Sequence, residues 1–172
     1  MALVDGFRIG YGEDAHALIS GVPLWLGGTE IPLSPVGANA HSDGDALLHA
    51  LSDALLSAWG LGDIGQIFPP SNPNFQDLSS QVILQTVQDR IRDQVGPTRL
   101  NNVAAVVTLD APKLGPHRLN VQRTLGELLG VEPSRIGLTF KTSEGLAPKH
   151  VQARATVLMR RTDGSGTGAD AA

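Results

Sequence analysis

Residues 103–109 read VAAVVTL, an uninterrupted run of β-prone side chains. A strand that is buried on both faces has this composition, because neither face needs polar residues. Further strands are predicted after it at 136–142 and 151–160, and shorter ones before it at 8–10 and 24–27. The sequence therefore predicts a sheet that other elements of the chain must cover.

Three helices, interleaved with these strands in the sequence, are predicted to pack on the sheet. Residues 45–59 (DALLHALSDALLSAW) have helical spacing of apolar side chains, a second helix begins at Asp77 or Ser79 and runs to about Val95, and a third spans roughly 116–129. We expect an α/β fold of the α+β sandwich kind: a mixed sheet of about four main strands plus a small hairpin, with three helices packed on one face. The predicted apolar faces of the helices are Leu47, Leu48, Leu51, Leu55 and Ala58; Leu78, Val82, Ile83, Val87, Ile91 and Val95; and Leu119, Leu125, Leu128 and Leu129.

The length of 172 residues suits a single domain, which we place at 1–161. The tail 162–172 is short of apolar side chains and is expected to be disordered. Three other segments are rich in glycine, proline and turn-forming residues and are expected to be turns and loops, namely 11–23, 29–44 and 60–75.

Composition excludes several classes of function. The chain has no cysteine, so disulfides, thiolate catalysis and thiolate-bound metal are ruled out. It has 13 basic and 17 acidic residues and 4% aromatics, without the basic face or stacking rings of a nucleic-acid-binding protein. No apolar run is long enough to span a membrane and the first residues do not form a secretory signal, so we expect a cytoplasmic protein. The charged share of 17% is below the usual value of about 25%, which fits a chain that buries surface against a partner.

A group of histidines and carboxylates has the spacing of metal ligands. Asp14 and His16 are two residues apart, so in an extended segment they point the same way and reach one ion together. With His49 they form a His₂Asp set, and three protein ligands plus an open fourth position are typical of a reactive zinc site. The spacing leaves a second interpretation open, in which Asp14 caps a turn and His49 is a half-buried histidine with its hydrogen bonds satisfied.

Two carboxylates lie near His49 on the predicted helix. Asp45, His49 and Asp53 follow one another at intervals of four residues, which places them on one helix face. Either Asp45 or Asp53 could therefore orient the imidazole from behind the metal.

Two further segments have the composition of ligand-binding loops. The glycines of 60–65 let backbone amides approach a ligand, although taken alone they are better explained by an ordinary helix end and turn. Lys141-Thr142-Ser143-Glu144-Gly145 combines a cation, two hydroxyls and a carboxylate, which suits phosphate and a hard cation, but also an exposed turn. His117 and His150 are isolated and are interpreted as structural or surface residues.

In this order, these segments resemble the 2-C-methyl-D-erythritol 2,4-cyclodiphosphate synthases of the non-mevalonate isoprenoid pathway, over about residues 8–160. The residues that carry the resemblance are RIGYGEDAH (8–16), AHSDGD (40–45), LHALSDALL (48–56), GLGDIG (60–65) with Phe68-Pro69, Ala111-Pro112-Lys113, and KTSE (141–144).

The resemblance implies a phosphorus–oxygen lyase. Its substrate, 4-diphosphocytidyl-2-C-methyl-D-erythritol 2-phosphate, cyclises when the 2-phosphate attacks the β-phosphate, and CMP leaves. The resemblance implies one Zn²⁺ per subunit on Asp14, His16 and His49, and Mg²⁺ or Mn²⁺ on the substrate diphosphate with Glu144 as protein ligand. It gives His41 and Thr142 the role of stabilising the transferring phosphoryl group. It also implies a homotrimer with active sites between subunits.

The resemblance extends to the substrate-binding residues. Ser42 would bind phosphate, Asp63-Ile64-Gly65 the methylerythritol portion, and the turn from Leu109 to Gly115 the cytosine. The full predicted substrate-binding set is Asp14, Ala15, His16, His41, Ser42, Asp63, Ile64, Gly65, Phe68, Asn72, Leu109, Ala111, Pro112, Lys113, Leu114, Lys141, Thr142, Ser143, Glu144 and Lys149.

The chain departs from the family pattern at two places. Residues 68–72 read FPPSN where the family often has Phe-Pro-Asp and a second acid, so an acidic contact to the erythritol hydroxyls is missing or moved. Residues 145–150 form a shortened stretch in which Lys149 takes the place of an arginine in binding diphosphate. Two other functions remain open: a metal-stabilised trimer that binds nucleotides or isoprenoid diphosphates without turnover, and a zinc-dependent phosphoesterase that uses bound hydroxide.

Overall fold

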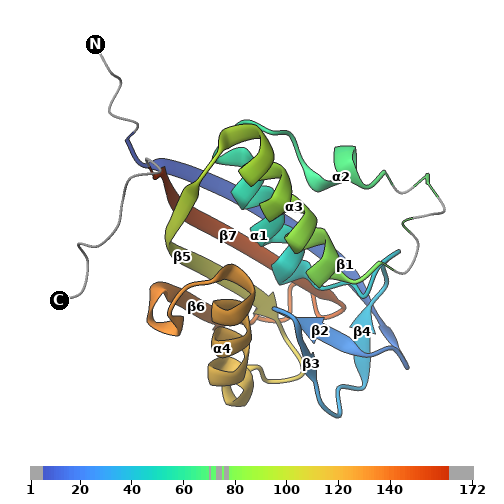
Figure 1. The fold of residues 1–172 in the computed structure, drawn as a ribbon. Helices are drawn as coiled ribbons and strands as arrows, with labels where there is room; N and C mark the ends of the chain where they lie inside the picture. Colours follow the sequence, from blue (N-terminus) through green and yellow to red (C-terminus); the bar gives the residue numbers. More distant parts are fainter. Residues whose placement is uncertain (1–5, 70, 73–74, 76–77, 163–172) are drawn as a thin grey trace.

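The computed structural model describes residues 6–69, 71–72, 75 and 78–162. Five strands form one mixed sheet in the order β4-β1-β7-β5-β6 (Figure 1). Only β5 and β6 are parallel among the described strand pairs of this sheet. A separate hairpin consists of β2 and β3. The strand bounds are β1 Arg8–Ser20, β2 Leu24–Leu26, β3 Thr29–Ile31, β4 Val36–Ala38, β5 Thr98–Leu109, β6 Ile136–Lys141 and β7 His150–Arg161.

Three long helices lie on the same side of the sheet (Figure 1): α1 (Ala46–Ser57), α3 (Ser80–Val95) and α4 (Arg118–Leu129). A short helix α2 (Ile64–Ile67) and two 3₁₀ turns, Gly115–His117 and Pro133–Arg135, complete the described helical structure. α1 packs directly on β1 and β7, and α3 packs on α1. The expected α+β architecture, with helices at the three predicted places, is therefore confirmed.

The loops predicted in the first half of the chain contain more regular structure than expected. β1 continues through most of the predicted turn region 11–23, because it pairs with β7 residue by residue from Arg8 opposite Met159 to Ala17 opposite His150. The segment 29–44 contains β3 and β4, so the main sheet has five strands rather than four, and 60–75 contains α2. Long-range pairing overrides local composition here.

Two residues predicted to lie on the apolar helix faces, one leucine and one valine, are exposed instead. Leu119 is 80% exposed, because α4 begins one residue before it and buries the i, i+4, i+8 series Val121, Leu125 and Leu129 instead. Val82 is 49% exposed on α3, whereas Ile83 and its helical neighbours are buried. The five predicted positions of α1 are all buried.

The prediction for 103–109 is also wrong in part. Val103, Ala105 and Val107 are buried beneath the helices, but Ala104 is exposed and Val106 is 37% exposed on the opposite face of the sheet. The helices cover only one face, so β5 alternates between core and solvent in this chain, as an antiparallel strand does.

The described part of the chain ends just after β7 at residue 162, and residues 163–172 of the predicted disordered tail lie outside it. Asp77, one of the two predicted helix starts, also lies outside the described residues, whereas Ser79 is the N-cap of α3. Within the described residues, no helix has the length and apolar character required to cross a membrane.

Candidate active site

Strand β1 presents two of the predicted metal ligands. Asp14 and His16 lie in the part of β1 that pairs with β7, opposite Ala153 and Val151. Because alternate residues of a strand point to the same face, both side chains point toward α1. The distance from Asp14 Oδ2 to His16 Nε2 is 2.7 Å.

Helix α1 supplies the third ligand, and two glycines allow it to come close enough. A Cβ atom on Gly10 would lie 1.8 Å from the carbonyl oxygen of Ala54, and one on Gly12 would lie 2.2 Å from that of Ala50. Any side chain at either position would push the helix off the strand. With glycine there, His49 Nδ1 lies 3.0 Å from Asp14 Oδ2.

Asp14, His16 and His49 form a compact cluster. Their ligand atoms all lie within 4.8 Å of one another, and the two imidazole rings meet edge to face with centroids 5.6 Å apart. Burial disfavours the ionised Asp14 carboxylate, but the two histidines outweigh burial and hold the pKa of Asp14 well below its usual range. Burial likewise lowers the pKa of His49, but Asp14, with smaller contributions from Asp45 and Asp43, outweighs burial, so the net pKa of His49 is raised.

The cluster fits a metal ion better than a set of ordinary hydrogen bonds. His16 Nε2 is buried and, despite its short distance to Asp14, makes no hydrogen bond within the described residues. A buried nitrogen without a hydrogen bond is costly unless it coordinates something. Two imidazole nitrogens and one carboxylate oxygen are also a donor set that zinc accepts, with a fourth position left open.

The two carboxylates predicted to orient His49 lie elsewhere. Asp45 is the N-cap of α1, and its buried carboxylate turns back over the helix start to accept backbone N–H groups. Its donors are Leu47 and Leu48, and also Gly27 and Gly28 in the β2–β3 turn, at 2.7–3.1 Å. The Asp45 side chain therefore joins the hairpin to α1 and does not bond the imidazole.

Rather than the imidazole, Asp53 binds the loop that is predicted to hold substrate. Its carboxylate accepts the backbone N–H of Ile64 at 2.8 Å, and burial raises its pKa. Asp63 in turn caps α2 by accepting the N–H of Gln66 at 2.9 Å. The predicted segment 63–65 is thus attached to the same helix that carries His49.

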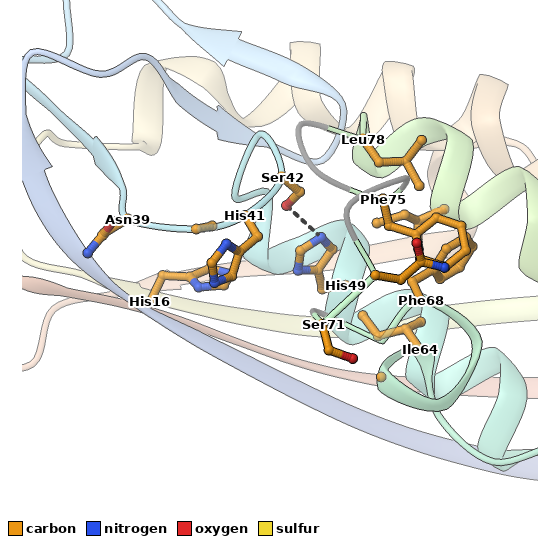
Figure 2. Close-up of a pocket in the computed structure, with 14 residues that line it drawn as sticks. His16, Asn39, His41, Ser42, His49, Ile64, Phe68, Ser71, Phe75 and Leu78 are labelled. Carbon is orange, nitrogen blue, oxygen red and sulfur yellow. Dashed lines mark hydrogen bonds between the residues drawn. The ribbon is translucent and has the colours of Figure 1, made fainter.

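A cavity of about 540 Å³ opens beside the cluster (Figure 2). His16, His41, Ser42 and His49 line one end, and Ile64, Phe68, Phe75 and Leu78 the other. The predicted site residues that the structure brings to this cavity are His16, His41, Ser42, His49, Ile64, Gly65, Phe68 and Asn72. The cavity therefore has a polar end next to the metal cluster and an apolar end under the segment after α2.

The other predicted substrate-binding segments, 109–114 and 141–144, lie outside this cavity. Thr142, Ser143 and Glu144 follow β6, and the turn 109–114 follows β5, its parallel neighbour, so both leave the sheet at the same edge. Asp110 links the two segments. Its carboxylate accepts hydrogen bonds from the backbone N–H of Ser143 and, at 2.7 Å, from the Ser143 hydroxyl. These hydrogen bonds lower the pKa of Asp110. In this group the Thr142 hydroxyl donates to Glu144 at 2.5 Å.

Residues around Lys149 line a smaller cavity with Ala111, near Leu18 and Val36. Within the described part of one chain, the structure therefore assembles the metal cluster with one half of the predicted substrate residues and gathers the other half separately.

Three contacts in and around the candidate site were not anticipated from the sequence. Ser80 Oγ lies 2.9 Å from His49 Nε2, Asp43 binds Ser80, and Asp110 binds Ser143. Asp43 stands inside the quoted AHSDGD segment, which is a signal that could have marked it. Nothing in the local sequence distinguishes Ser80 from the N-cap Ser79 beside it.

Comparisons with known proteins show the family to which the chain belongs. Residues 7–160 match the model of the YgbB family. A 2-C-methyl-D-erythritol 2,4-cyclodiphosphate synthase of Thermus thermophilus is 59% identical over 88% of this chain and 98% of its own length, and one of Deinococcus radiodurans is 54% identical over 91% and 96%. A solved structure of such a synthase in a CDP-bound form superposes with a TM-score of 0.82, at 56% identity over 88% of this chain and 99% of that one. The chain therefore belongs to the YgbB family, alongside 2-C-methyl-D-erythritol 2,4-cyclodiphosphate synthases.

Proposed function

We propose that this chain converts 4-diphosphocytidyl-2-C-methyl-D-erythritol 2-phosphate to 2-C-methyl-D-erythritol 2,4-cyclodiphosphate and CMP. It would do so as a lyase of isoprenoid precursor biosynthesis. The bond that forms joins an oxygen of the 2-phosphate to the β-phosphorus. The bond that breaks joins the β-phosphorus to the oxygen it shares with the α-phosphate, and CMP leaves with that oxygen. The observation that carries the proposal is the Asp14–His16–His49 cluster at the polar end of the cavity, in a chain that is 59% identical to a synthase of this kind.

The reaction needs no protein nucleophile, because both reacting groups belong to the substrate. The work of the protein is to fold the substrate, bring two phosphates together and offset their repulsion. Asp14, His16 and His49 would hold a zinc ion that supplies positive charge and a template for the phosphates when it is bound. Glu144 would hold Mg²⁺ or Mn²⁺ on the diphosphate.

The remaining predicted residues have roles that suit their positions. His41 lines the polar end of the cavity, and with Thr142 it would stabilise the charge on the transferring phosphoryl group. Residues 63–65 would bind the methylerythritol portion. The turn 109–114 would bind cytosine through backbone groups and Lys113, and a solved relative in a CDP-bound form supports a cytidine nucleotide as ligand.

We further propose that the chain works as a homotrimer whose sites lie between subunits. The face of the sheet opposite the helices is open, with Ile9 72% and Tyr11 51% exposed on it. The second group of substrate residues also lies outside the cavity of its own chain. A neighbouring subunit would cover the open face and bring its 109–114 and 141–144 segments to the cavity. Light scattering should give a mass near three times the 18.0 kDa of the chain, and a monomer would contradict this.

The reaction is tested by ³¹P NMR and chromatography of the cytidyl substrate with purified enzyme, with and without a chelator. We expect the cyclic diphosphate and CMP in equal amounts, and neither after zinc is removed. A folded, metal-loaded protein that releases no CMP would favour a binding protein instead. In ¹⁸O-labelled water the cyclic product should carry no label, whereas a hydrolytic phosphoesterase would incorporate it.

A further inference from the structure

The imidazole of His49 is held at both of its nitrogens. Nδ1 faces Asp14 at 3.0 Å, which is the side of the metal cluster. Nε2 faces the opposite way, toward Ser80 Oγ at 2.9 Å. Ser42 Oγ is farther from Nε2, at 3.4 Å (Figure 2), so Ser80 is the stronger partner.

Ser80 is itself bound by a carboxylate. It is the first residue of α3 and has no exposed surface. Asp43 Oδ2 accepts the backbone N–H of Ser80 at 3.0 Å, and Asp43 Oδ1 is in short contact with the Ser80 hydroxyl. The loop before α1 is thereby attached to the start of α3, and the Ser42–Leu78 bridge lies next to this attachment.

These contacts determine the direction of every hydrogen bond in the series. An ionised carboxylate only accepts, so the single hydroxyl proton of Ser80 is donated to Asp43. Ser80 Oγ can then only accept from His49, and His49 must carry its proton on Nε2. When the imidazole is neutral, as it is when it binds a metal, this leaves the lone pair of Nδ1 directed at the cluster.

We propose that Asp43 and Ser80 are positioning residues for the metal site: the series Asp43–Ser80–His49 fixes the ring orientation and the Nε2–H tautomer of His49, and so prepares Nδ1 for zinc. The proposal rests on the metal site proposed above. Neither residue is among those that line the cavity, and each acts through the imidazole.

The alternative is that Asp43 and Ser80 only stabilise the first turn of α3. The chain offers a matched control for this, because Ser79 is the N-cap of the same helix and its hydroxyl accepts the N–H of Gln81, away from His49. Ser80→Ala and Asp43→Asn should therefore be compared with Ser79→Ala, which removes a helix contact without removing a contact to the imidazole.

The first measurement is zinc affinity of the metal-free proteins, by competition with a chromophoric chelator, together with the visible spectrum of the Co²⁺-substituted proteins. Loss of a hydrogen bond to a metal-bound histidine typically lowers affinity 10- to 100-fold. We expect a loss of that size and a changed Co²⁺ spectrum for Ser80→Ala and Asp43→Asn, and less than a twofold change for Ser79→Ala. Equal zinc affinity in all three variants and the wild type would overturn the proposal.

The second measurement needs no variant. In zinc-loaded wild-type protein labelled with ¹⁵N-histidine, long-range ¹H–¹⁵N correlation should show His49 as Nε2–H, with a slowly exchanging proton. A zinc-bound His49 protonated on Nδ1 would overturn the proposal even if Ser80→Ala failed to fold. Wild-type protein that binds no zinc would instead contradict the metal site, so the two failures are distinguishable.

Discussion

Gly12 of β1 and Ala50 of α1 are in such close contact that a Cβ atom on Gly12 would lie 2.2 Å from the Ala50 carbonyl oxygen. This contact determines how near His49 comes to the two ligands on the strand. Gly12→Ala must displace the helix, and overpacking of this kind costs about 1–3 kcal/mol of stability. We expect weaker zinc binding as well as a lower Tm, measured by chelator competition and thermal unfolding.

Gly137→Ala is the control for this change. Gly137 lies on β6, and a Cβ there would be 3.4 Å from its nearest neighbour, the carbonyl oxygen of Val103. Zinc affinity should remain that of the wild type. If Gly12→Ala also kept full zinc affinity, the close approach of α1 to β1 would not be what determines zinc binding.

Asp45 should matter for folding rather than for metal binding. Its carboxylate accepts four backbone N–H groups from two elements, and Asp45→Ala would leave them buried without a partner. The cost of a lost N-cap and of unsatisfied buried donors is about 2–4 kcal/mol. Urea unfolding should show this loss, while zinc affinity per folded molecule changes little. A specific loss of zinc affinity without loss of stability would restore the role predicted from the spacing of Asp45 and His49.

Asp53 should affect substrate binding through the segment that it holds. Asp53→Ala frees the N–H of Ile64 and loosens residues 63–65. A hydrogen bond to a charged acceptor contributes about 1.5–3 kcal/mol, so we expect KM to rise at least tenfold with a smaller effect on kcat. Steady-state kinetics of CMP release measure this. Asp89→Asn, which changes an exposed ion pair with Arg92 on α3, should leave both constants unchanged.

Removing zinc should make stability depend on pH through Asp14 and His49. The pKa of Asp14 is below its ordinary value of 3.8, so its contribution is present above that pH and is lost as the pH falls through the lowered pKa. The pKa of His49 is above 6.5, so its contribution is present below pH 6.5 and is lost as the pH rises through the raised pKa. His16, Asp43 and Asp45 also surround this pair.

The zinc-free protein should therefore be most stable at pH values between the lowered pKa of Asp14 and the raised pKa of His49. Thermal unfolding from pH 4 to 9 in the presence of chelator should show wild type exceeding His49→Gln at pH 6, by a margin that shrinks at higher pH. A margin that stays constant to pH 9 would mean that the pair is not ionised as described.

The spacing of apolar residues predicted those elements whose structure depends mainly on residues close in the sequence. The helix expected at 45–59 is α1, 46–57, because its leucines repeat at the helical period and Asp45 caps it. The alternation of 151–160 likewise predicted the buried face of β7. The length of β1 could not be predicted, because its glycines and turn-forming residues are held extended by pairing with β7, more than 130 residues away in the sequence, and at its end with β4.

In the site, too, residues with a short-range spacing could be predicted, and contacts that depend on packing could not. The Asp-x-His pair and the helical His49 predicted a cluster that the structure assembles. The contact of Ser80 with His49 depends on the packing of α3 against α1, which no short-range spacing encodes. The roles of His41, Thr142, Glu144 and the residues around Lys113 stay predictions, and in one chain several of them lie apart from the cavity.

Two apolar side chains of β5, Ala104 and Val106, point away from the helices and face water in one chain. Ala104 is exposed and Val106 is 37% exposed in the described chain, so these apolar side chains contribute less to the stability of its own fold than those beneath the helices. Their exposure lowers solubility. A newly made chain therefore reaches its native shape with an apolar surface that favours self-association, and expression yield and refolding concentration should be limited by that face before they are limited by thermal stability.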